Sequence, residues 1–138
     1  MKKILIVDGQ GGRVGAAFVE QIIQGQEEAD LIVVGTNSFA TQTMMKAGSK
    51  IGATGENPII INAKSVDIII APIGFMIADS LYGEVTAAMT EAIYKSPAKK
   101  IILPFNECGD FYFATEAISM SRLIEIGIKR LRELLREN

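Results

Sequence analysis

Five short runs of the chain are continuously apolar, without the alternation that marks a strand with one exposed face. Runs of this kind, rich in Ile and Val, are typical of strands that are buried on both faces of a parallel sheet. We therefore predict strands over Ile4–Val7, Leu31–Val34, Pro58–Ile61, Ile68–Ala71 and Ile101–Leu103.

Between most of these runs, apolar residues recur every three or four positions, which predicts amphipathic helices. We expect helices over Arg13–Gln24, from the capping residue Asn37 or Ser38 to Gly48, over Glu84–Lys95 and over Ser119–Arg136. A polar loop is expected over Gly48–Asn57. The alternation predicts one α/β domain over residues 1–138, with three layers and a doubly wound, mostly parallel, Rossmann-like sheet.

Composition narrows the possible functions. The 138 residues are 49% hydrophobic, with a formal net charge of -2, no histidine and the single cysteine Cys108. We therefore expect no nucleic-acid or membrane partner, no disulfide, no metal site and no histidine-based acid–base catalysis. The high apolar content predicts a homodimer or higher oligomer. The four apolar residues after Lys3 are too few for a signal peptide, which predicts a cytoplasmic protein.

A glycine-rich turn separates the first strand from the first helix. Gly9, Gly12 and Gly15 have GxxGxxG spacing, and such a turn presents backbone amides and the positive helix end to an anion. The alternative is that these glycines only pack a sharp strand-to-helix corner. The cofactor-binding residues expected here are Gly9, Gln10, Gly11, Gly12, Arg13, Val14 and Gly15.

Over Ile4–Val19 this turn resembles the nucleotide loop of extended short-chain dehydrogenases, which implies a nucleotide cofactor. Asp8 departs from the small hydroxyl residue of that family, and its carboxylate would repel a pyrophosphate unless it turns away or binds a cation or the turn's own amides. The family's Tyr-x-x-x-Lys pair is missing at Tyr82, Tyr94 and Tyr112, so we do not expect a reductase of that mechanism.

The end of the second strand carries Thr36, Asn37 and Ser38 and no carboxylate for a ribose. These side chains could hydrogen-bond a 2′-phosphate, with Arg13 or Lys46 as a charge partner, which favours NADP over NAD if either binds. The alternative is simple capping of the second helix.

Pro72, Ile73 and Gly74 follow the fourth strand and are expected to complete the pocket. The apolar segment Pro72–Ala78 predicts either a ligand wall or, as we prefer, a subunit contact. Cys108 is expected to be inert, since neighbouring carboxylates disfavour its thiolate. Phe111–Phe113 predicts a short strand or a cap on the core.

The whole chain resembles a family of small bacterial proteins that is known only as a domain of unknown function, which implies no more than Rossmann-like character. The motifs that carry the resemblance are Asp8–Gly12, Val34–Ser38, Ala53–Asn57 and Pro72–Gly74.

Three functional hypotheses follow from the residues. The first is a non-catalytic sensor, carrier or subunit that binds a nucleotide or another phosphorylated small molecule at the glycine-rich turn. The second is an NAD(P)-type cofactor-dependent enzyme on an unknown substrate, with Asp8 or Glu56 as acid–base groups. The third is a protein-interaction scaffold that binds no ligand.

Overall fold

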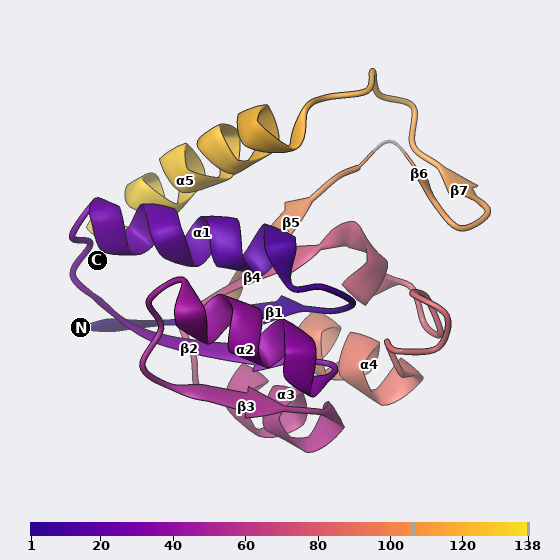
Figure 1. The fold of residues 1–138 in the computed structure, drawn as a ribbon, viewed down its shortest axis with the longest axis horizontal. Helices are drawn as coiled ribbons and strands as arrows, with labels where there is room; N and C mark the ends of the chain where they lie inside the picture. The colour runs from indigo at the N-terminus through magenta and orange to yellow at the C-terminus, as the bar shows by residue number, and fades with distance from the viewer. Residues whose placement is uncertain (106, 138) are drawn as a thin grey trace.

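The sheet has five parallel strands in the order β3-β2-β1-β4-β5, as a computed structural model that describes residues 1–105 and 107–137 shows (Figure 1). The register is continuous across the centre, where Ile6 of β1 pairs with Val33 of β2 and Ile70 of β4. The sheet confirms the predicted three-layer, doubly wound α/β fold. Its strands are β1 (Lys2–Asp8), β2 (Ala29–Gly35), β3 (Gly52–Thr54), β4 (Ile68–Pro72) and β5 (Lys99–Leu103).

Helices cover both faces of the sheet (Figure 1). They are α1 (Arg13–Gln24), α2 (Ser38–Lys46), α3 (Glu56–Ala63), α4 (Ala87–Lys95), α5 (Met120–Arg136) and the short 3-10 helix η1 (Ile73–Met76). None of the helices in the described part of the chain is both long and apolar enough to cross a bilayer.

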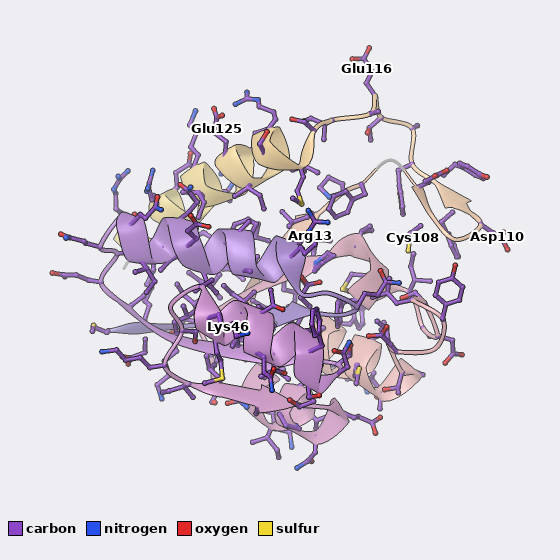
Figure 2. The ribbon with its side chains drawn as sticks, viewed as in Figure 1. Arg13, Lys46, Cys108, Asp110, Glu116 and Glu125 are labelled. Atoms are coloured by element: carbon purple, nitrogen blue, oxygen red, sulfur yellow. The ribbon has the colours of Figure 1, made fainter. Side chains whose placement is uncertain are left out.

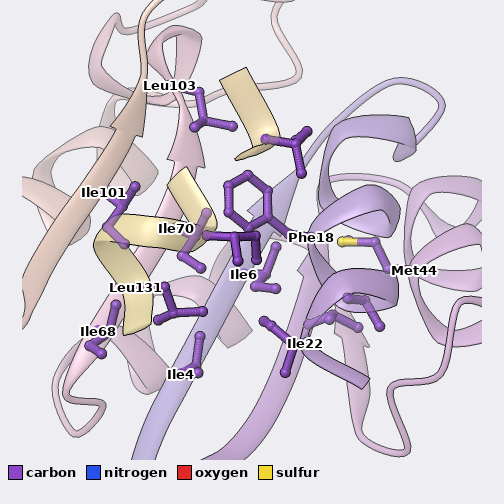
Figure 3. Close-up of a cluster of buried hydrophobic side chains, with 14 residues drawn as sticks. Ile4, Ile6, Phe18, Ile22, Met44, Ile68, Ile70, Ile101, Leu103 and Leu131 are labelled. Atoms are coloured by element: carbon purple, nitrogen blue, oxygen red, sulfur yellow. The ribbon is translucent and has the colours of Figure 1, made fainter. Parts of the chain in front are cut away.

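The strands divide their side chains between two cores, because successive residues point to opposite faces. Ile4 and Ile6 of β1 join a cluster with α1, α2 and α5, in which Phe18 is fully buried (Figure 3). Leu5 and Val7 join the other cluster, with η1, α3 and α4. This two-sided burial explains why the strands read as unbroken apolar runs.

One predicted strand is wrong. The run Pro58–Ile61 lies in helix α3, where Ile59 and Ala63, four residues apart, are buried while Ile61 is 53% exposed. Pro58 is tolerated because it lies in the first helical turn, whose amides have no partner within the helix. The third strand is instead β3, within the predicted loop Gly48–Asn57.

Smaller differences concern element ends. Helix α4 begins at Ala87 rather than Glu84, since the Thr86 side chain accepts a hydrogen bond from the amide of Met89. Helix α5 begins at Met120 rather than Ser119, since the Ser119 side chain accepts a hydrogen bond from the amide of Arg122.

The aromatic segment after β5 forms a hairpin. Strand β7 (Phe111–Tyr112) pairs antiparallel with β6 (Glu107–Cys108), which confirms a short strand there. Both residues of β7 are exposed, so they do not cap the core.

The segment Pro72–Ala78 exposes less apolar surface than expected. Phe75 is fully buried in the core beneath η1, so it contributes nothing to an exposed patch. A subunit contact at this segment stays a prediction.

Candidate functional site

The strand order reverses between β1 and β4, because the chain adds β2 and β3 on one side of β1 and β4 and β5 on the other. In open α/β sheets, ligands bind at such a point, outside the carboxyl ends of the strands. A cleft of about 630 Å³ lies there. We call it the strand-end cleft; it is lined by parts of the segments 8–14, 72–82 and 105–111.

The Asp8 carboxylate forms hydrogen bonds with the glycine-rich turn itself. Asp8 is 5% exposed, and its two carboxylate oxygens accept hydrogen bonds from the backbone amides of Gly9 and Gly15, each at 2.8 Å. The start of α1, where we expected a phosphate, is thus partly occupied by the chain's own carboxylate. We expected the Asp8 carboxylate to turn away, to bind a cation or to bind the turn's own amides, and the structure shows the last of these.

Burial raises the pKa of Asp8, because desolvation disfavours the charged form. The amides of Gly15, Gly9 and Val14 oppose this effect, and the nearby charge of Glu84 adds to it. Asp8 is therefore a carboxyl group that holds its proton more tightly than usual, in the wall of the cleft.

Two glycines of the turn face helix α2 rather than open space. Gly12 has φ +71°, and a methyl group there would lie 2.6 Å from the carbonyl oxygen of Ala40. A methyl group at Gly15 would overlap the sulfur of Met44. The contact between α1 and α2 alone accounts for glycine at both positions.

Glu84 crosses from the turn after η1 to the ends of β1 and β2. Its Oε1 accepts hydrogen bonds from the Gln10 amide at 2.9 Å, the Thr36 hydroxyl at 2.6 Å and the Asn37 side-chain amide at 2.8 Å. The desolvation of Glu84 raises its pKa, but the three hydrogen bonds outweigh it, and the net pKa is lowered. The donors therefore favour a negative charge at this position.

Thr36 and Asn37 thus already have an acceptor, and a 2′-phosphate would have to displace Glu84 to reach them. Asn37 also caps α2, because its side chain accepts from the amide of Ala40. Ser38 is exposed as the first residue of α2, and Lys46 is the last, at the far end of the helix from these side chains (Figure 2). Lys46 is therefore no charge partner for this position.

The far wall of the cleft comes from the hairpin and from the turn after η1. The Ser80 hydroxyl donates to the carbonyl oxygen of Gly74 at 2.5 Å. A methyl group at Gly74 would contact both Ser80 Oγ and Cys108 Sγ at 3.4 Å. Figure 2 shows Cys108 and Asp110 together on the hairpin that closes this side.

The cleft carries negative charge. Its lining includes Asp8, Asp79, Glu107 and Asp110, and no Lys or Arg among the residues that the structure describes. Within residues 1–105 and 107–137, no group of three or more His, Cys, Asp or Glu side chains is arranged to hold a metal ion.

The structure brings part of the predicted site together. The predicted residues that line the cleft are Gly9, Gln10, Val14, Pro72, Ile73 and Gly74. The lining also includes Asp8, a predicted acid–base candidate, and Ile77 and Ala78, from the segment predicted as a ligand wall or a subunit contact. Those of the described lining that were not predicted are Phe105, the turn residues 79–82 and the hairpin residues 107–111. Seven predicted residues lie outside the lining: Arg13, Gly11, Gly12 and Gly15, on or beside α1, and Thr36, Asn37 and Ser38, between the end of β2 and the start of α2.

Comparison with known proteins adds a family and a distant neighbour. A crystal structure of a dodecameric FMN-dependent Ubix-like decarboxylase from Escherichia coli O157:H7 is similar, with a TM-score of 0.46 and 14% identity, over 97% of this chain and 76% of that chain. An identity this low says nothing about activity. No curated protein matches the sequence. Residues 3–136 match the family described as "Domain of unknown function (DUF3842)", and the chain therefore belongs to that family.

Proposed function

We propose that the protein binds a small molecule in the strand-end cleft and acts as a sensor, carrier or subunit. The observation that carries this proposal is the cleft itself, about 630 Å³ at the point where the strand order reverses. That volume is in the usual range for a small-molecule site, and the position is the one that open α/β sheets use.

The walls suggest what kind of ligand would fit. Ile73, Ile77, Leu81 and Phe105 offer apolar surface to an organic ring system, and the carboxylates can accept hydrogen bonds from N–H or O–H groups. A nucleotide or another phosphorylated small molecule fits if its phosphate avoids the carboxylates. NADP belongs to this class of candidate ligands.

A cofactor-dependent enzyme is a second candidate, and one observation favours it. Asp8 lines the cleft and has a raised pKa, as a group that donates or accepts a proton near neutral pH often has. Both of its oxygens already accept a backbone amide. We therefore place the binding function first.

A thermal-shift panel tests the proposal. NAD, NADP, FMN, ATP, coenzyme A and S-adenosylmethionine would be compared with dephosphorylated partners such as riboflavin and adenosine. A compound at about 100 times its dissociation constant adds roughly 2.7 kcal/mol of stability, which corresponds to a rise in melting temperature of roughly 9 °C for a chain of this size. If no compound raises the melting temperature, the result would contradict ligand binding and favour the protein-interaction scaffold.

Two variants show whether a stabilising compound sits in the cleft. Gly74→Val places methyl groups against Cys108 and Ser80 and should abolish the shift. Ala92→Val, in the separate hollow of about 510 Å³ between α3 and α4, serves as the matched control and should retain the shift. A shift that survives Gly74→Val would place the ligand elsewhere.

A further inference from the structure

We propose that Glu84 fills an anion subsite of this protein, and that a phosphate group takes its place when the Glu84 side chain swings out. The phosphate is either free or part of a ligand whose body lies in the strand-end cleft. The second form of the proposal rests on the proposed function, whereas the subsite itself does not.

The first step is the convergence of donors. The Gln10 amide follows β1, while the Thr36 hydroxyl and the Asn37 side-chain amide follow β2, and all three donate to the single atom Glu84 Oε1. Three donors around one oxygen satisfy a phosphate oxygen as well as a carboxylate. The lowered pKa of Glu84 shows that this surrounding favours an anion.

The second step is that hydrogen bonds other than those to Glu84 hold the donor residues in place. Asn37 is held by its own hydrogen bonds to the Gln10 carbonyl oxygen, at 3.0 Å, and to the amide of Ala40, at 2.8 Å. Thr36 is tied through its backbone amide to the Asp8 carbonyl oxygen at 3.0 Å. The donors are therefore positioned by the strand ends and the helix cap rather than by the carboxylate that they bind.

The third step is that Glu84 lies on a turn with a strained backbone. Asp79, Leu81 and Tyr82 all have positive φ, at 64°, 56° and 57°, and Tyr82 is fully exposed. Left-handed backbone is unfavourable for Leu and Tyr and clusters at functional and switching segments. Release of this turn would relieve that strain and offset part of the loss of the three hydrogen bonds.

The fourth step is the shared wall with the cleft. Gln10 both lines the strand-end cleft and donates to Glu84, so an anion in place of Glu84 would adjoin a ligand in the cleft. Glu84 also interacts electrostatically with Asp8, because the negative charge of Glu84 raises the pKa of Asp8. A phosphate in this position would again place negative charge beside Asp8.

The test follows the Gln10 amide by ¹H–¹⁵N NMR during a titration with inorganic phosphate. Glu84→Ala empties the subsite, and Glu84→Gln keeps an acceptor oxygen without the charge. Glu91→Ala removes the same charge from the exposed Glu91–Lys95 pair of α4 and is the matched control. We expect phosphate to shift the Gln10 signal in Glu84→Ala with at least tenfold higher affinity than in the wild type or in Glu91→Ala, while chloride at equal ionic strength gives no shift.

AMP, with adenosine as the control that lacks a phosphate, distinguishes the two sources of phosphate. If the subsite serves a ligand held in the cleft, AMP binds Glu84→Ala more tightly than inorganic phosphate does; if it serves free phosphate, the two affinities are equal. Either result supports the subsite.

The proposal is overturned if phosphate leaves the Gln10 signal of a folded Glu84→Ala protein unmoved, or if Glu91→Ala gains phosphate affinity equally. Should Glu84→Ala not fold, Glu84→Gln takes its place: the neutral side chain is displaced more easily than the carboxylate, so phosphate must shift the Gln10 signal with higher affinity than in the wild type, and an equal or lower affinity overturns the proposal. If no compound of the thermal-shift panel raises the melting temperature but phosphate shifts the Gln10 signal, the proposed function fails and the subsite stands. If a compound binds in the cleft but phosphate does not shift the Gln10 signal, the proposed function stands and the subsite fails.

Discussion

Gly12→Ala measures how far the glycine-rich turn is built for the contact between helices. The new methyl group would sit 2.6 Å from the carbonyl oxygen and 2.8 Å from the Cα of Ala40, both backbone atoms that cannot rotate away. Left-handed φ for alanine costs about 1–2 kcal/mol, and overpacking against a fixed neighbour adds about 1–3 kcal/mol. We therefore expect the free energy of unfolding to fall by about 2–5 kcal/mol.

Gly109→Ala is the matched control for this variant. Gly109 also has left-handed φ, at +56°, but a methyl group there meets nothing within 4 Å. It should lose no more than the backbone cost of about 1–2 kcal/mol. Urea unfolding followed by circular dichroism gives both values. If the two variants lost the same stability, the contact with Ala40 would not be the reason for glycine at position 12.

Three further changes test other parts of the account. Asp8→Ala should lower the free energy of unfolding in urea by about 1–3 kcal/mol, because two backbone amides lose their acceptor. Removing a desolvated carboxylate offsets only part of this loss. Hydrogen exchange at the Gly15 amide should become faster. Glu84 has a lowered pKa, so its contribution to stability is present above its unfolded pKa of 4.5 and is lost as pH falls through the folded value; Glu84→Gln should flatten that acid decline in thermal melts across pH. Gly127→Ala places a methyl group on the ring of Phe18, which costs about 1–3 kcal/mol, while alanine in the interior of α5 gains about 1 kcal/mol. Urea unfolding should therefore show a net loss of up to about 2 kcal/mol; a gain of about 1 kcal/mol would contradict close packing of α5 on α1.

The fold could be predicted where burial is symmetric. Ile4–Val7 and Ile68–Ala71 lie at the centre of the sheet with helices on both faces, so every residue is apolar and the run is easily recognised. Helix α1 has one buried face, and its predicted bounds, Arg13–Gln24, match the structure.

The edge of the sheet could not be predicted in this way. Strand β3 has three residues, and a methyl group at Gly52 would lie 2.6 Å from the sulfur of Met45, so close contact with α2 leaves no room for an apolar side chain. Pro58–Ile61 is apolar enough to be a strand, but the burial of Ile59 and Ala63 follows helical spacing. Periodicity over four residues cannot separate these cases.

The candidate site shows the same division. The ends of β1 and β4 could be located because the topology places them at one edge. Glu84 could not, since it lies 47 residues from Asn37 along the chain and no local motif marks it. Nor can spacing say whether a glycine faces a ligand or a helix, and at Gly12 and Gly15 it faces α2.

The most direct test of the account is an NMR titration of ¹⁵N-labelled protein with the most stabilising compound of the panel. Binding in the strand-end cleft should give saturable shifts of the Gln10, Gly74 and Cys108 amides and leave Ala63 and Ala92, beside the α3–α4 hollow, unchanged. Saturable shifts confined to Ala63 and Ala92, or no saturable shift at the strand ends, would contradict the claim that this cleft is the binding site.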